Sequence, residues 1–174
     1  MASNQNISPN IKDKAKIRNL FINCTNESTI TKKTALNVLR NLHLKDNRLR
    51  YPNIPEYART SPKYNDTTAN GLTKCIIDFI RLSGGQAERI NCTGRVIKKG
   101  LRQQYIATSG QRGTADISAT INGRSVKIEV KIGNDRQSEY QKKYQHDIES
   151  SGGIYYIAKN FASFYVWFIK TFEK

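Results

Sequence analysis

The stretch "TADISATINGRSVKIEVK", from Thr114 to Lys131, decides the fold of this 174-residue chain. Two runs of alternating apolar and polar residues flank Asn122-Gly123, and this pattern is the strongest short-range signal for a β-hairpin with a two-residue turn. Such a turn pairs Ile121 with Arg124. Each step outward pairs the next residue on either side, so the sequence predicts that Asp116 lies opposite Glu129.

Side chains alternate between the two faces of a strand, and the predicted hairpin has two contrasting faces. One face is apolar and is expected to face the core: Ala115, Ile117, Ala119, Ile121, Val126, Ile128 and Val130. The other face is polar: Asp116, Ser118, Thr120, Lys127, Glu129 and Lys131. The ordinary interpretation of such a pattern is that the polar face is exposed to solvent and has no further role.

Two directly opposed carboxylates are normally unfavourable, and the solvated face does not explain them. A divalent cation removes the repulsion, because Mg²⁺ is bound by one or two carboxylates together with waters and substrate phosphates. Lys131 lies two positions beyond Glu129 on the same face. We therefore expect Asp116 and Glu129 to share a metal ion, with Lys131 beside a phosphate oxygen or a bound water.

The segments around the hairpin predict an α/β core on a mixed sheet. Residues 72–83 form an amphipathic helix that Gly84 ends, and "AERINCTG" reads as a short strand. Residues 135–153 read as a helix and "GIYYIAK" as a strand. The tail after Asn160 fits either a helix or a strand, and we favour the helix because of its apolar stripe: Phe164, Trp167, Phe168, Thr171 and Phe172.

Residues 1–66 have a different pattern and are expected to be a basic helical N-terminal extension with a connector. Short helices are predicted over residues 11–22 and 31–44, followed by an extended segment rich in proline and turn-forming residues. Residues 67–174 are expected to form the main domain. The basic residues of such helices more often serve solubility than binding. This extension is nevertheless a candidate for DNA contacts or for a dimer surface.

The charge of the chain points to a polyanionic partner, since 29 Lys and Arg stand against 14 Asp and Glu. Nucleic acid is the first candidate. A membrane is disfavoured because no apolar run approaches the ~20 residues that a spanning helix needs. Cys24, Cys75 and Cys92 are too few and too widely spaced for a disulfide framework or a zinc site. Reduced thiols and an N-terminus unlike a signal peptide predict a cytoplasmic protein.

An acid-free basic run just before Asp116 is the candidate approach for DNA. Its basic residues are Arg89, Arg95, Lys98, Lys99, Arg102 and Arg112. A solvated loop is the alternative, but backbone charge neutralisation supplies most non-specific affinity for nucleic acid. Lys142 and Lys143 could extend the same groove. Tyr105 is expected to be a core aromatic of a short "QQYIA" strand, with base stacking as the alternative.

The series "ADISATINGRSVKIEVK" and "QSEYQKKYQHDIESSGGIYYIAK" resembles the core of the PD-(D/E)XK nuclease superfamily over roughly residues 70–160. It is most similar to virus-type replication-repair nucleases (VRR-NUC) and Holliday-junction resolvases. The resemblance implies a restriction-endonuclease-like core of helix, strand, β-hairpin, helix and strand. Asp116, Glu129 and Lys131 match the superfamily's metal-site motif, and Gln141 matches a glutamine that the following helix carries toward the active site.

The resemblance further implies that Asp116, Glu129 and the Val130 carbonyl hold Mg²⁺, with Mn²⁺ able to substitute. Lys131 and Gln141 complete the catalytic set, although a surface glutamine is the ordinary interpretation of Gln141 taken alone. Ala115 replaces the usual proline. Many members place a Glu in the first helix, where this chain offers only Asp78, or else Asn70 or Thr73, so one metal ion is better supported than two.

These observations predict a metal-dependent DNA endonuclease, structure-specific for branched or junction DNA in replication or recombination, with RNA not excluded as a partner. The alternative is a non-catalytic nucleic-acid-binding module that keeps the nuclease fold; an RNA-associated structural protein fits less well. Junction resolvases act as homodimers because two strands must be cut, whereas replication-repair relatives need not.

Overall fold

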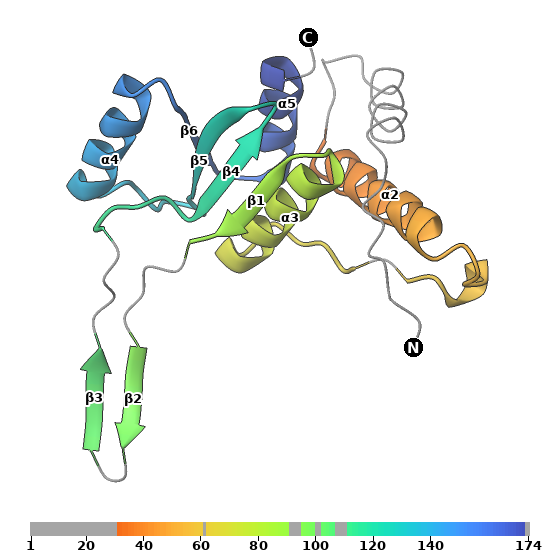
Figure 1. Cartoon of the computed structure of the whole chain (residues 1–174), viewed down its shortest axis with the longest axis horizontal. Coiled ribbons are helices and arrows are strands. Elements are labelled where there is room, and N and C mark those ends of the chain that lie inside the picture. Colours follow the sequence, from red (N-terminus) through yellow and green to blue (C-terminus); the bar gives the residue numbers. More distant parts are fainter. Residues whose placement is uncertain (1–30, 61, 91–94, 100–101, 107–110, 173–174) are drawn as a thin grey trace, which may run out of the picture.

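The computed structural model describes residues 31–60, 62–90, 95–99, 102–106 and 111–172, with side chains left undescribed in 95–99 and 102–106 (Figure 1). The helix predicted over residues 11–22 lies outside the described residues, and so do Cys24 and Cys92. Within the described part of the chain, no helix has the length and apolar character to cross a bilayer.

A four-stranded mixed sheet forms the centre of the protein, as the sequence predicts. The strands are β1 (Gln86–Arg89), β4 (Ile117–Ile121), β5 (Arg124–Val130) and β6 (Ile154–Ala158), and they lie side by side in the order β1-β4-β5-β6. Neighbours are antiparallel except for β5 and β6, which are parallel. The parallel pair requires a crossover connection, and helix α4 (Glu139–Ser150) provides it.

The β4–β5 hairpin has the predicted register. Ile121 pairs with Arg124 and Ile117 with Ile128, and the turn residues Asn122 and Gly123 both have positive φ, at 49° and 76°. Positive φ at both central positions is what a type I′ turn requires, and its twist suits a hairpin. Asp116 and Glu129 are therefore the next pair outward.

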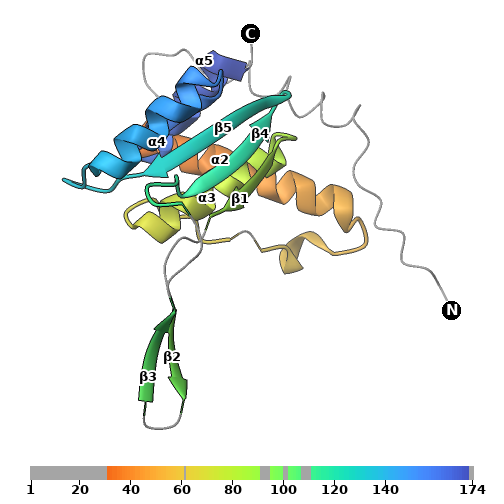
Figure 2. The same cartoon turned by 60° about the vertical axis from the view of Figure 1, so that its left-hand side comes forward.

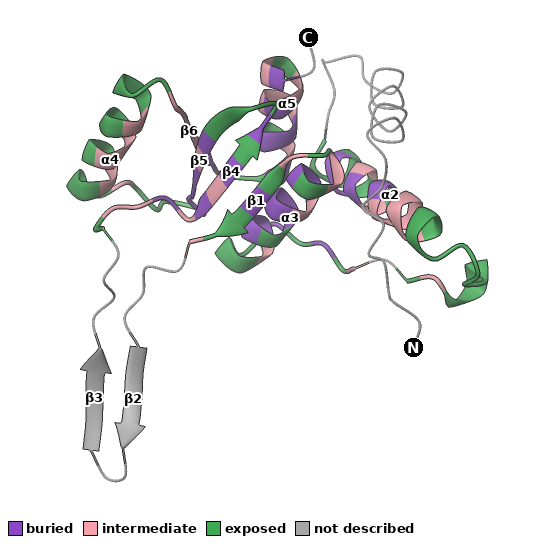
Figure 3. Cartoon of the chain, viewed as in Figure 1, coloured by how far each residue is buried: buried purple, intermediate pink, exposed green. Residues whose placement is uncertain are grey.

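The apolar face of the hairpin is buried as predicted, from Ala115 and Ile117 on one side to Val126 and Ile128 on the other (Figure 3). Helices α3 (Ala69–Leu82) and α5 (Phe161–Phe172) contribute to the same core. The ring of Phe79 meets four aromatic rings of α5 edge-on, with centroids 5.0–6.1 Å away: Phe161, Phe164, Tyr165 and Phe168. The predicted helix in the tail is thus confirmed, because its aromatic stripe closes this core.

Helix α4 lies on the other face of the sheet, away from α2 (Lys32–Arg50) and α3, as Figure 2 shows. It begins at Glu139, four residues later than predicted, because Ser138 and Gln141 form a capping box. It ends where predicted. Gly152 has φ +80°, and the N–H groups of Gly152 and Gly153 donate back to Glu149 and Ile148, which is a Schellman motif.

Helix α2 confirms the helix predicted over residues 31–44 and extends it to Arg50. It packs against α3 and α5, and its apolar side joins the common core: Ala35, Leu36, Leu39 and Leu42. The connector that follows has one short 3₁₀ helix, η2 (Glu56–Ala58), and is otherwise irregular. The predicted domain boundary after residue 66 remains a prediction.

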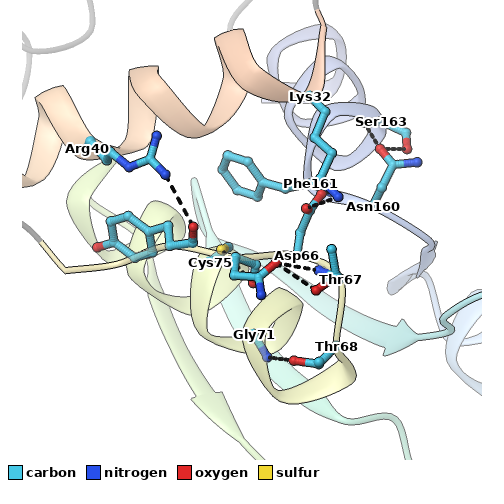
Figure 4. Close-up of polar contacts among 12 residues, drawn as sticks. Lys32, Arg40, Asp66, Thr67, Thr68, Gly71, Cys75, Asn160, Phe161 and Ser163 are labelled. Atoms are coloured by element: carbon cyan, nitrogen blue, oxygen red, sulfur yellow. Dashed lines mark hydrogen bonds and ion pairs between the residues drawn. The ribbon is translucent and has the colours of Figure 1, made fainter.

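Asp66 ties three distant segments together, as Figure 4 shows. Its carboxylate is buried at the start of α5, where one oxygen accepts the backbone N–H of Phe161 at 3.0 Å. The other oxygen forms an ion pair of 2.8 Å with Lys32, the first residue of α2. The connector is therefore anchored to both helices just before α3 begins.

The basic run before Asp116 contains a second hairpin that the sequence analysis missed. Strands β2 (Arg95–Lys99) and β3 (Arg102–Ile106) pair with each other in a separate two-stranded sheet, apart from the four-stranded sheet in Figure 1. The predicted "QQYIA" strand is β3, and the paired residues form strands where the alternative interpretation expected a loop. Gly100, between two short runs that contain β-branched or aromatic residues at Val96–Ile97 and Tyr105–Ile106, is the signal in the sequence for this pairing.

We expect Asp66→Ala to lower the free energy of unfolding by about 1–3 kcal/mol, because it leaves the buried N–H of Phe161 without its acceptor. Asp66→Asn keeps an acceptor and loses only the ion pair with the half-exposed Lys32, so it should cost less than about 1 kcal/mol. Urea denaturation of both variants measures the difference. Equal losses would show that the ion pair, rather than the helix contact, carries the effect.

Candidate metal centre

Glu129 lies on β5 and is the most buried carboxylate of the polar face, with only 2% of its surface exposed. Its Oε1 accepts hydrogen bonds from the Gln141 side-chain amide and from Lys131, whose Nζ is 3.1 Å away. Its Oε2 is equally buried and has no hydrogen-bond partner among the described residues. The solvated face, which is the ordinary interpretation of the sequence pattern, is therefore not what the structure has at Glu129.

Gln141 is bound from three directions at the start of α4. Its side-chain oxygen accepts the backbone N–H of Ser138 at 2.9 Å and the ammonium of Lys131 at 3.2 Å, while its NH₂ group donates to Glu129. These contacts fix which end of the carboxamide faces the carboxylate. The structure thus brings Gln141 to Glu129 and Lys131, and the capping pattern S-x-x-Q was the signal in the sequence that could have placed its side chain.

Lys131 follows β5 and is 7% exposed. Its ammonium contacts Glu129 and lies 3.4 Å from Asp135, a residue that the sequence analysis did not select. Burial opposes the charged form, but the hydrogen bond and the negative charge of Glu129, with that of Asp135, raise the pKa of Lys131 overall. The ammonium is therefore held charged beside the buried carboxylate.

Asp116 precedes β4 and reaches across the hairpin. Its Oδ2 accepts the backbone N–H of Val130 at 2.8 Å, so it is fixed next to the strand that carries Glu129. Burial and the negative charge of Asp116 raise the pKa of Glu129 to about 7, even though Lys131 opposes this shift. The two carboxyl groups therefore repel each other electrostatically, as the register predicted.

The donor set fits a hard divalent cation. A buried carboxylate oxygen that no described residue hydrogen-bonds, next to a second carboxylate, is a site that gains from a positive ion. Within the described ranges no group of three or more His, Cys, Asp and Glu side chains is placed to share an ion. Mg²⁺ needs only one or two carboxylates, so Asp116 and Glu129 suffice. The Val130 carbonyl as a further ligand remains a prediction.

Helix α3 supplies no carboxylate to the pair formed by Asp116 and Glu129. Asp78 on α3 accepts the Tyr64 hydroxyl at 3.0 Å and the Lys74 ammonium at 2.7 Å. Thr73 is buried and donates its hydroxyl to the carbonyl of Ala69, while Asn70 is exposed. Helix α3 packs on the apolar face, opposite the polar face that carries Glu129, which explains why Asp78 and Thr73 have other partners.

Gly113 is a positioning residue that sequence analysis missed. It has φ +83°, and a Cβ at this position would lie 2.8 Å from the backbone nitrogen of Gln141 and closer still to the Tyr140 carbonyl. The loop before Asp116 therefore touches the first turn of α4 through bare backbone. This contact fixes Gln141 relative to the carboxylate pair, and no local sequence pattern reveals it.

The candidate DNA-binding residues are distributed unevenly around the centre. Lys142 and Lys143 are exposed on α4, and Arg112 is exposed beside the first turn of that helix. Arg89 is exposed but pairs with Ile117, so the register directs it toward the face opposite Glu129. Four others lie on the second hairpin, where their side chains are outside the described residues: Arg95, Lys98, Lys99 and Arg102.

The sequence matches no protein-family model, and no curated protein matches it either.

The raised pKa of Glu129 predicts a pH-dependent stability in metal-free buffer. The folded protein retains this proton up to about pH 7, whereas the unfolded chain releases it near 4.5. The stability contribution is therefore full below pH 4.5 and is lost as the pH rises through 7. Relative to Glu129→Gln, the wild-type free energy of unfolding should fall by on the order of 3 kcal/mol over this interval in EDTA. A constant difference would contradict the raised pKa.

Gly113→Ala is expected to weaken Mn²⁺ binding and to cost about 1–3 kcal/mol of stability beyond its backbone strain, because the added methyl group displaces the first turn of α4. Gly152→Ala is the matched control. Gly152 has nearly the same φ, +80°, but nothing lies within 4 Å of its Cβ position. Calorimetric titration and urea denaturation compare the two variants, and equal behaviour would show that Gly113 serves only its own turn.

Proposed function

We propose that this protein is a metal-dependent DNA endonuclease that hydrolyses phosphodiester bonds. The observation that carries the proposal is the buried Glu129, with one oxygen held by Gln141 and Lys131 and the other left without a hydrogen-bond partner among the described residues. Asp116 is close enough to raise its pKa. A buried acid without such a use would cost stability, so its presence favours a function.

The residues have separate roles in this proposal. Asp116 and Glu129 would hold the ion, and a bound Mg²⁺ would supply charge neutralisation at the phosphate and a lowered pKa of water. Lys131, kept charged by Glu129 and Asp135, stabilises negative charge that develops on the phosphate oxygens. Gln141 holds the Glu129 carboxylate in one orientation, since its own oxygen is fixed by Ser138 and Lys131.

The arrangement of elements and the charge of the chain support the same proposal. Helix α3, strand β1, the β4–β5 hairpin, helix α4 and strand β6 occur along the chain in the order that the resemblance to PD-(D/E)XK nucleases implies, with the β2–β3 hairpin inserted between β1 and β4. The net charge of +15 favours a polyanionic substrate. Branched or junction DNA is the structured substrate we propose, and Mn²⁺ is expected to replace Mg²⁺.

Cleavage of a panel of nicked, branched and duplex DNA in Mg²⁺ and in Mn²⁺ tests the proposal. We expect cleavage of at least one substrate by the wild-type protein and a loss of at least about 100-fold in rate for Asp116→Asn and Glu129→Gln, because each removes a charged ligand of the ion. Glu139→Gln is the matched control: Glu139 is an exposed acid on α4 that pairs with Lys142, and its removal should leave the rate unchanged.

Absence of cleavage in both metals would refute the proposal. If the protein then still bound DNA, and if Asp116→Ala and Glu129→Ala bound it equally well or better, a non-catalytic nucleic-acid-binding module would be the correct function. Loss of cleavage in the Glu139→Gln control would instead show that the assay responds to charge on α4 in general.

A further inference from the structure

Tyr140 and Arg112 form an exposed pair at the edge of the candidate centre. The Arg112 guanidinium carbon lies 5.9 Å from the centre of the Tyr140 ring, and Tyr140 is 58% exposed even with this contact. We propose that this pair, hereafter the Tyr140 platform, binds an unpaired nucleobase of the DNA next to the cleaved phosphate. This inference rests on the proposed nuclease function and names the substrate feature that it selects.

The position of the platform is fixed relative to the carboxylate pair. Tyr140 directly precedes Gln141, whose side chain donates to Glu129. The backbone of Gly113 packs against the Tyr140 carbonyl, and Gly113 follows Arg112 in the chain. Both members of the platform are therefore attached to one rigid contact between the loop and the first turn of α4, one residue away from a side chain of the centre.

The platform does not serve the packing of the protein. Helix α4 buries none of its residues fully, and its packing aromatic is Tyr144, whose ring meets that of Tyr155 at a centroid distance of 6.4 Å. Tyr140 is outside the hydrophobic core cluster. A large aromatic side chain held in solvent beside a guanidinium is therefore available for a ligand.

The chemistry of the platform suits an unpaired base. Every base has a π-face, and exposed aromatic rings with arginine bind single-stranded nucleic acid by stacking and cation–π contacts. Bases inside a continuous duplex are already stacked and do not offer their faces. Lys143 and Arg136 are exposed nearby in sequence, and the acid Glu139 is paired with Lys142, so the surroundings tolerate the adjoining phosphates.

The substrate class that follows is DNA with at least one unpaired nucleotide at the cleavage site, such as a flap, a gap or a single strand. A fully paired duplex would reach the carboxylates without using Tyr140. The platform is thus a specificity-determining element and not part of the catalytic set. Its removal should change which DNA is bound, with the metal site left intact.

The test uses the full chain with Glu129→Gln in EDTA, so that no DNA is cut. The probes are single-stranded and flap oligonucleotides with one 2-aminopurine in the unpaired segment, and a blunt duplex of the same sequence. We expect 2-aminopurine fluorescence to fall on binding. Adding Tyr140→Ala should abolish this quenching and lower single-strand affinity by about tenfold, with duplex affinity unchanged. Tyr140→Phe should retain both, because it keeps the ring.

Tyr57→Ala is the matched control, since Tyr57 is 92% exposed on η2 and belongs to no part of the proposed site. It should leave quenching unchanged. Unaltered quenching and affinity in Tyr140→Ala would overturn the inference, and so would equal losses for single strands and duplex. The metal-dependent cleavage panel tests the nuclease proposal separately. If the Tyr140→Ala variant cleaves the same substrates as the wild type, only the Tyr140 platform is refuted. If base binding depends on Tyr140 but no DNA is cleaved, the platform is supported and the nuclease proposal is refuted.

Discussion

The hydrogen bond between the Gln141 amide and the buried carboxylate of Glu129 joins helix α4 to the polar face of the sheet, and the candidate centre depends on it. The same carboxamide closes the capping box of α4 through Ser138 and accepts from Lys131. A single side chain therefore sets where the helix starts and how the carboxylate is oriented. Because the Gln141 carboxamide contacts both the start of α4 and the Glu129 carboxylate, a displacement of α4 also changes the geometry of that carboxylate.

The electrostatics of the centre follow from burial. Burial of the Glu129 carboxylate, with one oxygen that no side chain or backbone group in the described ranges hydrogen-bonds, is costly, and the neighbouring charge of Asp116 adds to the cost. The pKa of Glu129 therefore rises to about 7. The positive charge of Lys131 opposes part of this rise in the pKa of Glu129, but the Lys131 ammonium also pairs with Asp135. In a chain with a net charge of +15, the result is a small site where two carboxyl groups lie close together.

The opposite face of the sheet supports this site through a packed core. Phe79 interlocks with the aromatic rings of α5, and Asp66 anchors the connector to α2 and α5, so β4 and β5 are backed by a dense core. Functional side chains on strands supported in this way are held more precisely than side chains on free loops. The contact of Gly113 with the first turn of α4 joins the loop that carries Arg112 to the same structure.

The local sequence pattern by itself determined much of the protein. The alternation of apolar and polar residues around Asn122-Gly123 fixed the hairpin register and its two faces, and apolar periodicity located α3 and α5. These signals depend only on residues that are close together in the chain. Tertiary structure alone decided the rest. The burial of Glu129, the partners of Lys131, the close approach of Gly113 to Tyr140 and the core contacts of α2 each join residues from different elements, and no short window contains them. Strand pairing sets which side chains lie opposite each other. Packing between elements sets which of them lose contact with water, and the raised pKa of Glu129 depends on that loss.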